Sequence, residues 1–134
     1  MPPNNRFVPV SPEVDALARE VVDSAIKVHR TLGPGLLESV YEACLGRELD
    51  VRGIPIKVQV PVTVHYEGLR LEAGFRADLL VANQVIVELK AVEGLLPIHE
   101  AQLLTYLKLL DLRLGLLINF NVPLLKDGIR RLVR

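Results

Sequence analysis

The spacing of hydrophobic residues in the first part of the chain predicts two helices. Between residues 12 and 32, apolar side chains recur every three or four positions, which is the period of one helical face. Ser11-Pro12 is a typical helix start, because the hydroxyl can cap the helix and proline suits its first position. Gly33 ends this helix, and a second one is expected over residues 36–51.

The hydrophobic period then changes to two residues, which predicts strands. From Ile56 to Tyr66 the even-numbered positions are apolar, and from Leu69 to Val81 the odd-numbered positions are apolar. Each strand is therefore expected to bury one face. Pro61 removes a backbone donor, so the first strand is expected to bend there or to lie at a sheet edge. A third strand is expected over residues 85–91.

The last third of the chain predicts one further helix and two strands. Pro97 opens a helix that runs to about Asp111. Residues 114–120 form a continuous apolar run, which is typical of a strand buried on both faces. A short edge strand is expected over residues 129–133. This succession of helices and strands predicts an α/β fold.

The register of the second and third strands determines where their polar residues lie. Opposed residues of an antiparallel pair share one face, so two apolar odd-numbered faces align only if paired residue numbers add to an even sum. A loop centred on Asn83 gives the sum 166 and places Asp78 opposite Glu88. Lys90 follows on the same face. Two opposed carboxylates repel each other unless a proton or a cation lies between them.

A divalent metal ion would relieve this repulsion. Two carboxylates, completed by water and phosphate oxygens, suit Mg²⁺, and such an ion can activate water and orient a phosphate. Lys90 could position or deprotonate that water, or offset negative charge. The triplet Glu88-Leu89-Lys90 can equally be an ordinary exposed ion pair. On the following helix, His99, Gln102 and Tyr106 form a polar stripe that could close over the metal face.

Composition limits the classes of protein to consider. The chain has 134 residues, half of them hydrophobic, which predicts one domain over residues 1–134 with a flexible N-terminus at residues 1–10. Cys44 is the only cysteine, which excludes an internal disulfide and, with the signal-free N-terminus, predicts a cytoplasmic protein. No stretch is apolar enough to span a membrane. Net charge is zero, although a basic tail could form a phosphate-contacting patch or a solvated face: Lys126, Arg130, Arg131 and Arg134.

The arrangement of Asp78, then Glu88-Leu89-Lys90, then a helix with Gln102 resembles the PD-(D/E)XK nuclease superfamily. Within it, the segment Gly35-Leu36-Leu37-Glu38-Ser39-Val40-Tyr41 is similar to the signature of the GxxExxY protein family. Further segments that resemble this family, in the same order along the chain, are residues 29–35, 76–80, 85–91, 99–108 and 115–120. The sequence departs from the family pattern at residues 73–75 and at Asn121.

The resemblance implies a restriction-endonuclease-like core of order αβββαβ, with a four-stranded mixed sheet flanked by helices. It implies that Mg²⁺ or Mn²⁺ is held by Glu38, Asp78, Glu88 and the backbone carbonyl of Leu89. Lys90 would act on the attacking water, and Gln102 would orient Lys90 or the phosphate. Tyr41, His99 and Tyr106 are expected to support the site rather than to react. His29 and His99 are expected mainly to make local contacts on their helices.

The function expected from these residues is metal-dependent hydrolysis of phosphodiester bonds in nucleic acid, DNA more readily than RNA. The resemblance implies products with a 5′-phosphate and a 3′-hydroxyl. The alternative is a nucleic-acid- or protein-binding module on a nuclease-like fold. A homodimer, or a place in a larger complex, is also compatible with a chain that has no separate DNA-reading domain.

Overall fold

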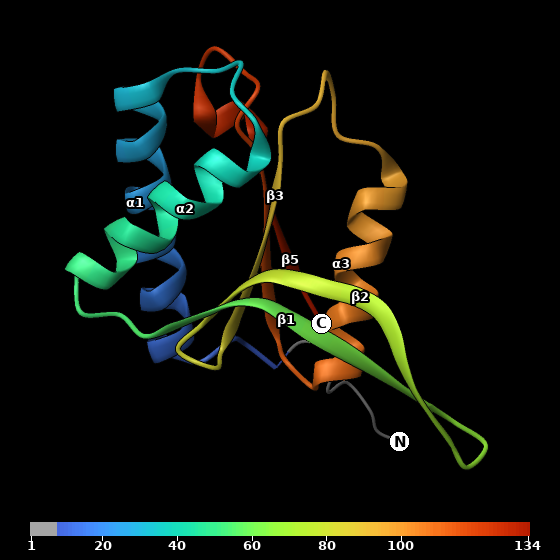
Figure 1. Cartoon of the computed structure of the whole chain (residues 1–134). Helices are drawn as coiled ribbons and strands as arrows, with labels where there is room; N and C mark the ends of the chain where they lie inside the picture. Colours follow the sequence, from blue (N-terminus) through green and yellow to red (C-terminus); the bar gives the residue numbers. More distant parts are fainter. Residues whose placement is uncertain (1–7) are drawn as a thin grey trace.

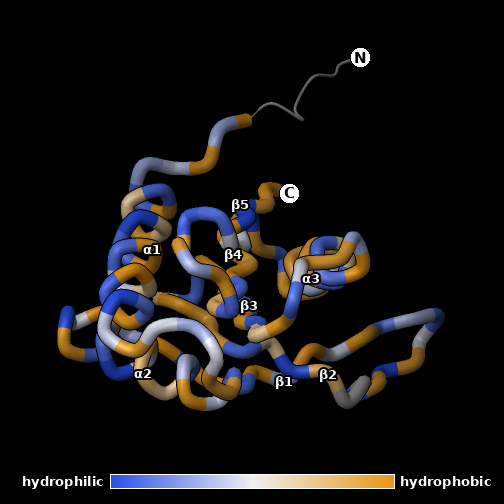
Figure 2. The backbone as a smooth tube through the Cα atoms, turned by 90° about the horizontal axis from the view of Figure 1, so that it is seen from above, coloured by the Kyte–Doolittle hydropathy of each residue, from blue (hydrophilic) through white to orange (hydrophobic). Residues whose placement is uncertain are grey.

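The chain folds into one mixed sheet with helices on both faces (Figure 1). The computed structural model describes residues 8–134, except the side chains of residues 73 and 74. The elements in chain order are α1 (Pro12–Leu32), α2 (Glu38–Val51), β1 (Ile56–Tyr66), β2 (Leu69–Val81), β3 (Val85–Lys90), α3 (Pro97–Leu110), β4 (Leu114–Asn119), the 3-10 turn η2 (Leu125–Gly128) and β5 (Ile129–Val133). Seen from above, α1 and α2 cover one face of the sheet and α3 covers the other (Figure 2).

The sheet order is β1-β2-β3-β4-β5, so β1 and β5 are its edges. Among the described strands, only the β3–β4 pair is parallel, and α3 makes the crossover between these strands. The predicted mixed α/β fold is confirmed, but the sheet has five strands rather than four, because Ile129–Val133 pairs with β4. Pro61 lies in an edge strand, as its missing donor requires.

The helix boundaries follow from local signals. Ser11 caps α1 by accepting a hydrogen bond from the Val14 N–H at 3.3 Å, and Gly33 ends it with φ 76°. The start of α2 was predicted two residues too early, since the helix begins at Glu38. Leu37, its N-cap residue, has no side-chain oxygen to mark the boundary in the sequence.

Two apolar clusters hold the layers together. One lies between the sheet and α1 and α2, and contains the odd-numbered residues Leu79, Val81, Val85, Val87 and Leu89. The other lies under α3 and includes even-numbered residues of the same strands, such as Ile86, which is fully buried. The central strands β3 and β4 are therefore buried on both faces.

The prediction that β1 and β2 each keep one buried face is wrong. Ile56 packs on the α1 and α2 side, whereas Val60 packs on the α3 side, although both positions are even. Gln59, between them, has φ 51° and shifts the alternation by one position. Beyond this point the hairpin projects past α3 (Figure 1), and Tyr66 and Leu69 are 67% and 57% exposed.

The basic tail does not form one patch. Arg131 pairs with Asp15 at 2.9 Å, and Arg134 pairs with Asp111 at 3.1 Å, so these guanidinium groups fasten β5 to neighbouring elements. Residues 1–7 of the expected flexible N-terminus lie outside the described residues. Within residues 8–134, no helix has the length and apolar character needed to cross a membrane.

Candidate metal centre between α2 and α3

Asp78 and Glu88 lie where β2 and β3 stop pairing. The ladder pairs Leu79 with Val87 and Val81 with Val85, so paired numbers add to 166, and the predicted register is confirmed. At the next position, hydrogen bonds from backbone N–H groups to side-chain carboxylates replace the backbone-to-backbone bonds of the ladder. The Asp78 N–H donates to Glu88 Oε2 at 2.7 Å, and the Leu89 N–H donates to Asp78 Oδ2 at 2.8 Å. Each carboxylate is thus held by the backbone of the opposite strand.

Glu88 carries an unfavourable charge. Glu88 is only 5% exposed. Its burial, together with the nearby charge of Asp78, raises the pKa of Glu88 to about 7. The Asp78 N–H and the charge of Lys90 oppose this rise in pKa, while Glu38 adds to it. The repulsion expected between the two carboxylates is therefore present.

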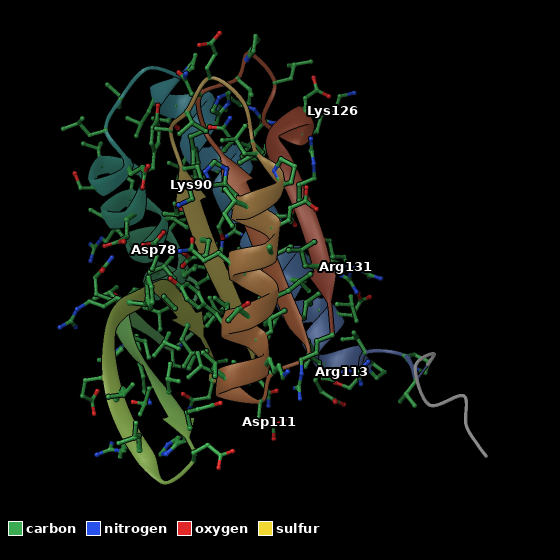
Figure 3. All side chains as sticks on the ribbon, turned by 90° about the vertical axis from the view of Figure 1, so that its right-hand side faces the viewer. Asp78, Lys90, Asp111, Arg113, Lys126 and Arg131 are labelled. Atoms are coloured by element: carbon green, nitrogen blue, oxygen red, sulfur yellow. The ribbon has the colours of Figure 1, made fainter. Side chains whose placement is uncertain are left out.

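Lys90 is the last residue of β3 and lies beside this pair. Figure 3 shows Asp78 and Lys90 in the space between α2 and α3. The Lys90 carbonyl accepts a hydrogen bond from the Phe120 N–H at 2.9 Å, which ties the end of β3 to the end of β4. The Lys90 side chain is partly buried, and its charge acts on Glu88.

Asn119 holds the chain that leaves β3. It is 2% exposed and lies next to Lys90 in the parallel ladder. Its Oδ1 accepts the Val92 N–H at 3.1 Å and its Nδ2 donates to the Val92 carbonyl at 2.9 Å. The sequence prediction missed this role. The available signal was a single amide residue at the end of an apolar run.

Glu38 is an exposed residue in the first turn of α2, and its charge acts on Glu88. The preceding loop is fixed by Tyr41, which is fully buried and stacks on Phe120 with ring centroids 4.4 Å apart. The Tyr41 hydroxyl donates to the Gly33 carbonyl at 2.6 Å and accepts the Leu36 N–H at 3.1 Å. Tyr41 therefore holds the loop that leads into α2, while its expected support of Glu38 stays a prediction.

Helix α3 covers the sheet face opposite to α1 and α2, and carries Gln102 and Tyr106 (Figure 2). Tyr106 is 5% exposed, and its pKa is raised by burial and then by the charges of Glu88 and Asp78. Gln102 lies one turn earlier and is partly buried. His99 instead accepts the Leu96 N–H at 3.0 Å through Nδ1, so it caps the start of α3.

Two further polar residues, absent from the sequence prediction, extend the site towards α2. Gln59 Nε2 lies 2.7 Å from Glu42 Oε1 and 3.3 Å from Asp78 Oδ1. The pKa of Glu42 is raised, first by burial and then by the charges of Asp78 and Glu38, although the Gln59 hydrogen bond lowers it. Glu42 follows Glu38 by one helical turn, and this spacing was a usable signal. Nothing in the alternating pattern around Gln59 marked it.

The donor set fits a hard divalent cation. Asp78 and Glu88 offer carboxylate oxygens from adjacent strands, and the buried Glu88 lacks a full counter-charge. Mg²⁺ is commonly bound through one or two carboxylates, with water and phosphate supplying the rest. Within residues 8–134, no three acidic, histidine or cysteine side chains converge closely enough to hold a metal. Glu38 is therefore near the pair but is not brought into one ligand set with it.

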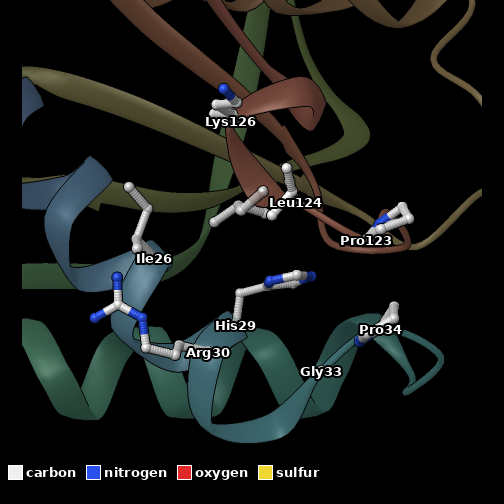
Figure 4. Close-up of a pocket in the computed structure, with 9 residues that line it drawn as sticks. Ile26, His29, Arg30, Gly33, Pro34, Pro123, Leu124 and Lys126 are labelled. Atoms are coloured by element: carbon white, nitrogen blue, oxygen red, sulfur yellow. The ribbon is translucent and has the colours of Figure 1, made fainter.

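A cavity of about 440 Å³ lies between the end of α1 and residues 123–126, and neither Asp78 nor Glu88 lines it (Figure 4). Its walls are largely apolar, and two exposed cations, Arg30 and Lys126, stand at its rim. Arg30 lies in the last turn of α1, where a cation stabilises the negative end of the helix dipole. The expectation that His29 makes a local contact on its own helix is wrong, because His29 is only 7% exposed and donates a 2.8 Å hydrogen bond through Nε2 to the distant Val122 carbonyl.

Comparison with known families identifies one superfamily. The family model described as PD-(D/E)XK nuclease superfamily matches residues 15–132. The chain belongs to this superfamily. The match spans both helices before the sheet, the Asp78–Glu88–Lys90 strands and α3. No functionally curated protein and no solved structure matches the chain at a significant level. The narrower resemblance to the GxxExxY family stays a prediction.

Proposed function

We propose that this PD-(D/E)XK superfamily member is a metal-dependent nuclease that hydrolyses phosphodiester bonds, those of DNA in preference to RNA. The observation that carries the proposal is the Asp78–Glu88 pair with Lys90 next to it. A buried carboxyl with a pKa near 7, facing a second carboxylate, is unfavourable for stability alone. The two carboxylates would bind a divalent cation, which in turn would bind a phosphate group of the substrate.

Asp78, Glu88 and the carbonyl of Leu89 would hold Mg²⁺ or Mn²⁺. When bound, such an ion lowers the pKa of water and offsets negative charge on a phosphate. Asp78 and Glu88 are already oriented, because each accepts a backbone N–H from the opposite strand. Glu38 would act from α2 through its charge or a bridging water.

Lys90 would neutralise charge on the reacting phosphate or accept a proton from the attacking water. Its position is supported by the bond between its carbonyl and the Phe120 N–H, and by the Asn119 bonds to Val92. Gln102 on α3 would orient the Lys90 amine or the phosphate. We further propose that residues 1–134 act as a single domain and, from the lone Cys44, that they act in the reducing cytoplasm.

The second candidate is a nucleic-acid- or protein-binding module without turnover. A net charge of zero and an aromatic content of 4% indicate a modest affinity for nucleic acid in either candidate, since that affinity usually rests on basic patches and stacking rings. The presence of Lys90 beside the acidic pair favours the enzyme, because binding alone has no need of it. Function as a homodimer or within a larger complex is compatible with both candidates.

The deciding experiment offers double-stranded, single-stranded and branched DNA and RNA to the protein with Mg²⁺ or Mn²⁺. Asp78→Ala and Lys90→Ala are expected to abolish cleavage. Asp23→Ala and Lys108→Ala, which change exposed residues of α1 and of the last turn of α3, are expected to leave cleavage intact. Cleavage that survives both site variants would exclude this centre. Binding without metal and without cleavage of any substrate would establish the module.

A further inference from the structure

Gln59 adopts a backbone conformation that its position in a strand does not explain. Its φ of 51° lies in the left-handed region, which residues with a β-carbon rarely adopt inside a strand. The neighbours on either side remain paired, Val58 with Leu79 and Val60 with Ala77. Such outliers cluster at functional sites, where the surroundings hold them in place.

The unusual backbone is supported from the opposite strand. Arg76 Nη1 donates to the Gln59 carbonyl at 3.2 Å, which supplies a partner for that carbonyl where the regular ladder is interrupted. Both strands also change faces here, since Ile56 and Leu79 belong to the α1 and α2 side, while Val60 and Ala77 belong to the α3 side. Gln59 and Asp78 lie where the two strands change faces.

The Gln59 side chain connects α2 with the acidic pair. Its Nε2 donates to Glu42 Oε1 at 2.7 Å and to Asp78 Oδ1 at 3.3 Å. Asp78 Oδ2 meanwhile accepts the Leu89 N–H. A hydrogen bond to each oxygen fixes the plane of the Asp78 carboxylate, and such bonds from outside the ligand set tune metal binding.

We propose that Gln59 is a positioning residue that orients Asp78 for metal binding and separates its charge from that of Glu42. The inference rests on the metal centre of the proposed function. An amide is the suitable group, because it donates to both carboxylates at once and stays neutral at every pH. A carboxylate in its place would add a third negative charge.

The first test measures the affinity of the purified, metal-free protein for Mn²⁺ alone, by isothermal titration calorimetry at pH 8. Gln59→Ala is expected to weaken Mn²⁺ binding about tenfold, within the range known for groups that orient metal ligands. Gln84→Ala, in the exposed turn between β2 and β3, is the matched control and is expected to bind like the parent. An affinity for Gln59→Ala within twofold of the parent overturns the inference.

Gln59→Gly separates the amide from the backbone. Glycine adopts φ 51° freely, so this variant keeps the backbone conformation of residue 59 but loses the side chain. It is expected to bind Mn²⁺ as weakly as Gln59→Ala, while its metal-free melting temperature exceeds that of Gln59→Ala. Full Mn²⁺ affinity in Gln59→Gly would show that the backbone alone matters, and would overturn the role of the amide.

Gln59→Glu tests the separation of charges. Its metal-free melting temperature at pH 8 is expected to fall below that of the parent and to recover with Mn²⁺. A melting temperature at or above the parent value would contradict an amide placed between two carboxylates. Asp78→Ala distinguishes a failure of the proposed role of Gln59 from a failure of the metal centre. If it loses Mn²⁺ binding while Gln59→Ala keeps it, only the inference fails. If Asp78→Ala binds like the parent, or the parent binds no Mn²⁺, the metal centre itself fails.

Discussion

Asp78 and Glu88 exchange backbone-to-side-chain hydrogen bonds across two strands: Glu88 accepts the Asp78 N–H at 2.7 Å, and Asp78 accepts the Leu89 N–H at 2.8 Å. Two groups that repel each other are thereby fixed side by side, and the charge of Lys90 offsets their repulsion only in part. The bonds to backbone N–H groups stabilise the negative charges only in part, because the pKa of Glu88 is still raised to about 7. Stability and metal affinity should therefore change in opposite directions when this pair is altered.

Glu88→Gln should stabilise the metal-free protein at pH 8. The amide has nearly the same shape, keeps an oxygen that can accept the Asp78 N–H, and removes the repulsion with Asp78. We expect a gain of about 1 to 3 kcal/mol and a rise in Tm of several degrees. The Tm increase that Mn²⁺ gives the parent should be lost. Glu67→Gln, in the exposed hairpin turn, serves as the control, and an unchanged Mn²⁺ response in Glu88→Gln would contradict the site assignment.

The stability of the metal-free protein should depend on pH through Glu88. Because folding raises the pKa of this carboxyl from 4.5 to about 7, the native state binds the proton more tightly than the unfolded chain. The resulting stabilisation is fully present below pH 4.5 and is lost as the pH rises to 7. Its size is on the order of 3 kcal/mol. Urea unfolding at pH 5 and pH 8 should show a larger loss of stability for the parent than for Glu88→Gln, and equal losses would refute this origin.

Lys90→Gln should reduce cleavage while leaving the metal site in place. The variant keeps a polar side chain of similar length but removes the cation and the proton acceptor. We expect cleavage to fall by at least about a hundredfold, the usual contribution of an acid–base group. Mn²⁺ affinity should be unchanged or higher, because a positive charge near Glu88 is removed. Cleavage and Mn²⁺ affinity can be measured on one preparation, with Lys108→Gln, in the last turn of α3, as control. A parallel loss of Mn²⁺ binding would assign Lys90 to the structure of the site instead.

Tyr41→Phe should destabilise the protein and disturb Glu38. The substitution keeps the stacking on Phe120 but removes both hydroxyl bonds, leaving the Gly33 carbonyl and the Leu36 N–H without that partner. We expect a loss of about 1 to 3 kcal/mol in urea unfolding. Tyr66→Phe, whose residue is 67% exposed, should cost little. If Tyr41→Phe equals that control, the hydroxyl does not hold the loop.

The sequence alone determined the elements and the central register. Helical and strand periods are local properties, so the start of α1 follows from Ser11-Pro12 and its end from Gly33. The opposition of Asp78 and Glu88 also follows, because a short turn links the two strands and their odd-numbered apolar faces must align. These features depend on residues close together in the chain.

Only the tertiary structure decided which distant residues complete the site. Gln59 reaches Asp78 because a left-handed residue shifts the alternation of β1, and an apolar and polar pattern carries no trace of that shift. Asn119 binds Val92 because β3 and β4 are brought together by a crossover, and Glu42 meets Gln59 because α2 packs beside β1. Each contact joins segments whose separation in space is set by packing of the whole core. The carboxylate pair is thus a local property of one hairpin, while its surroundings are a property of the fold.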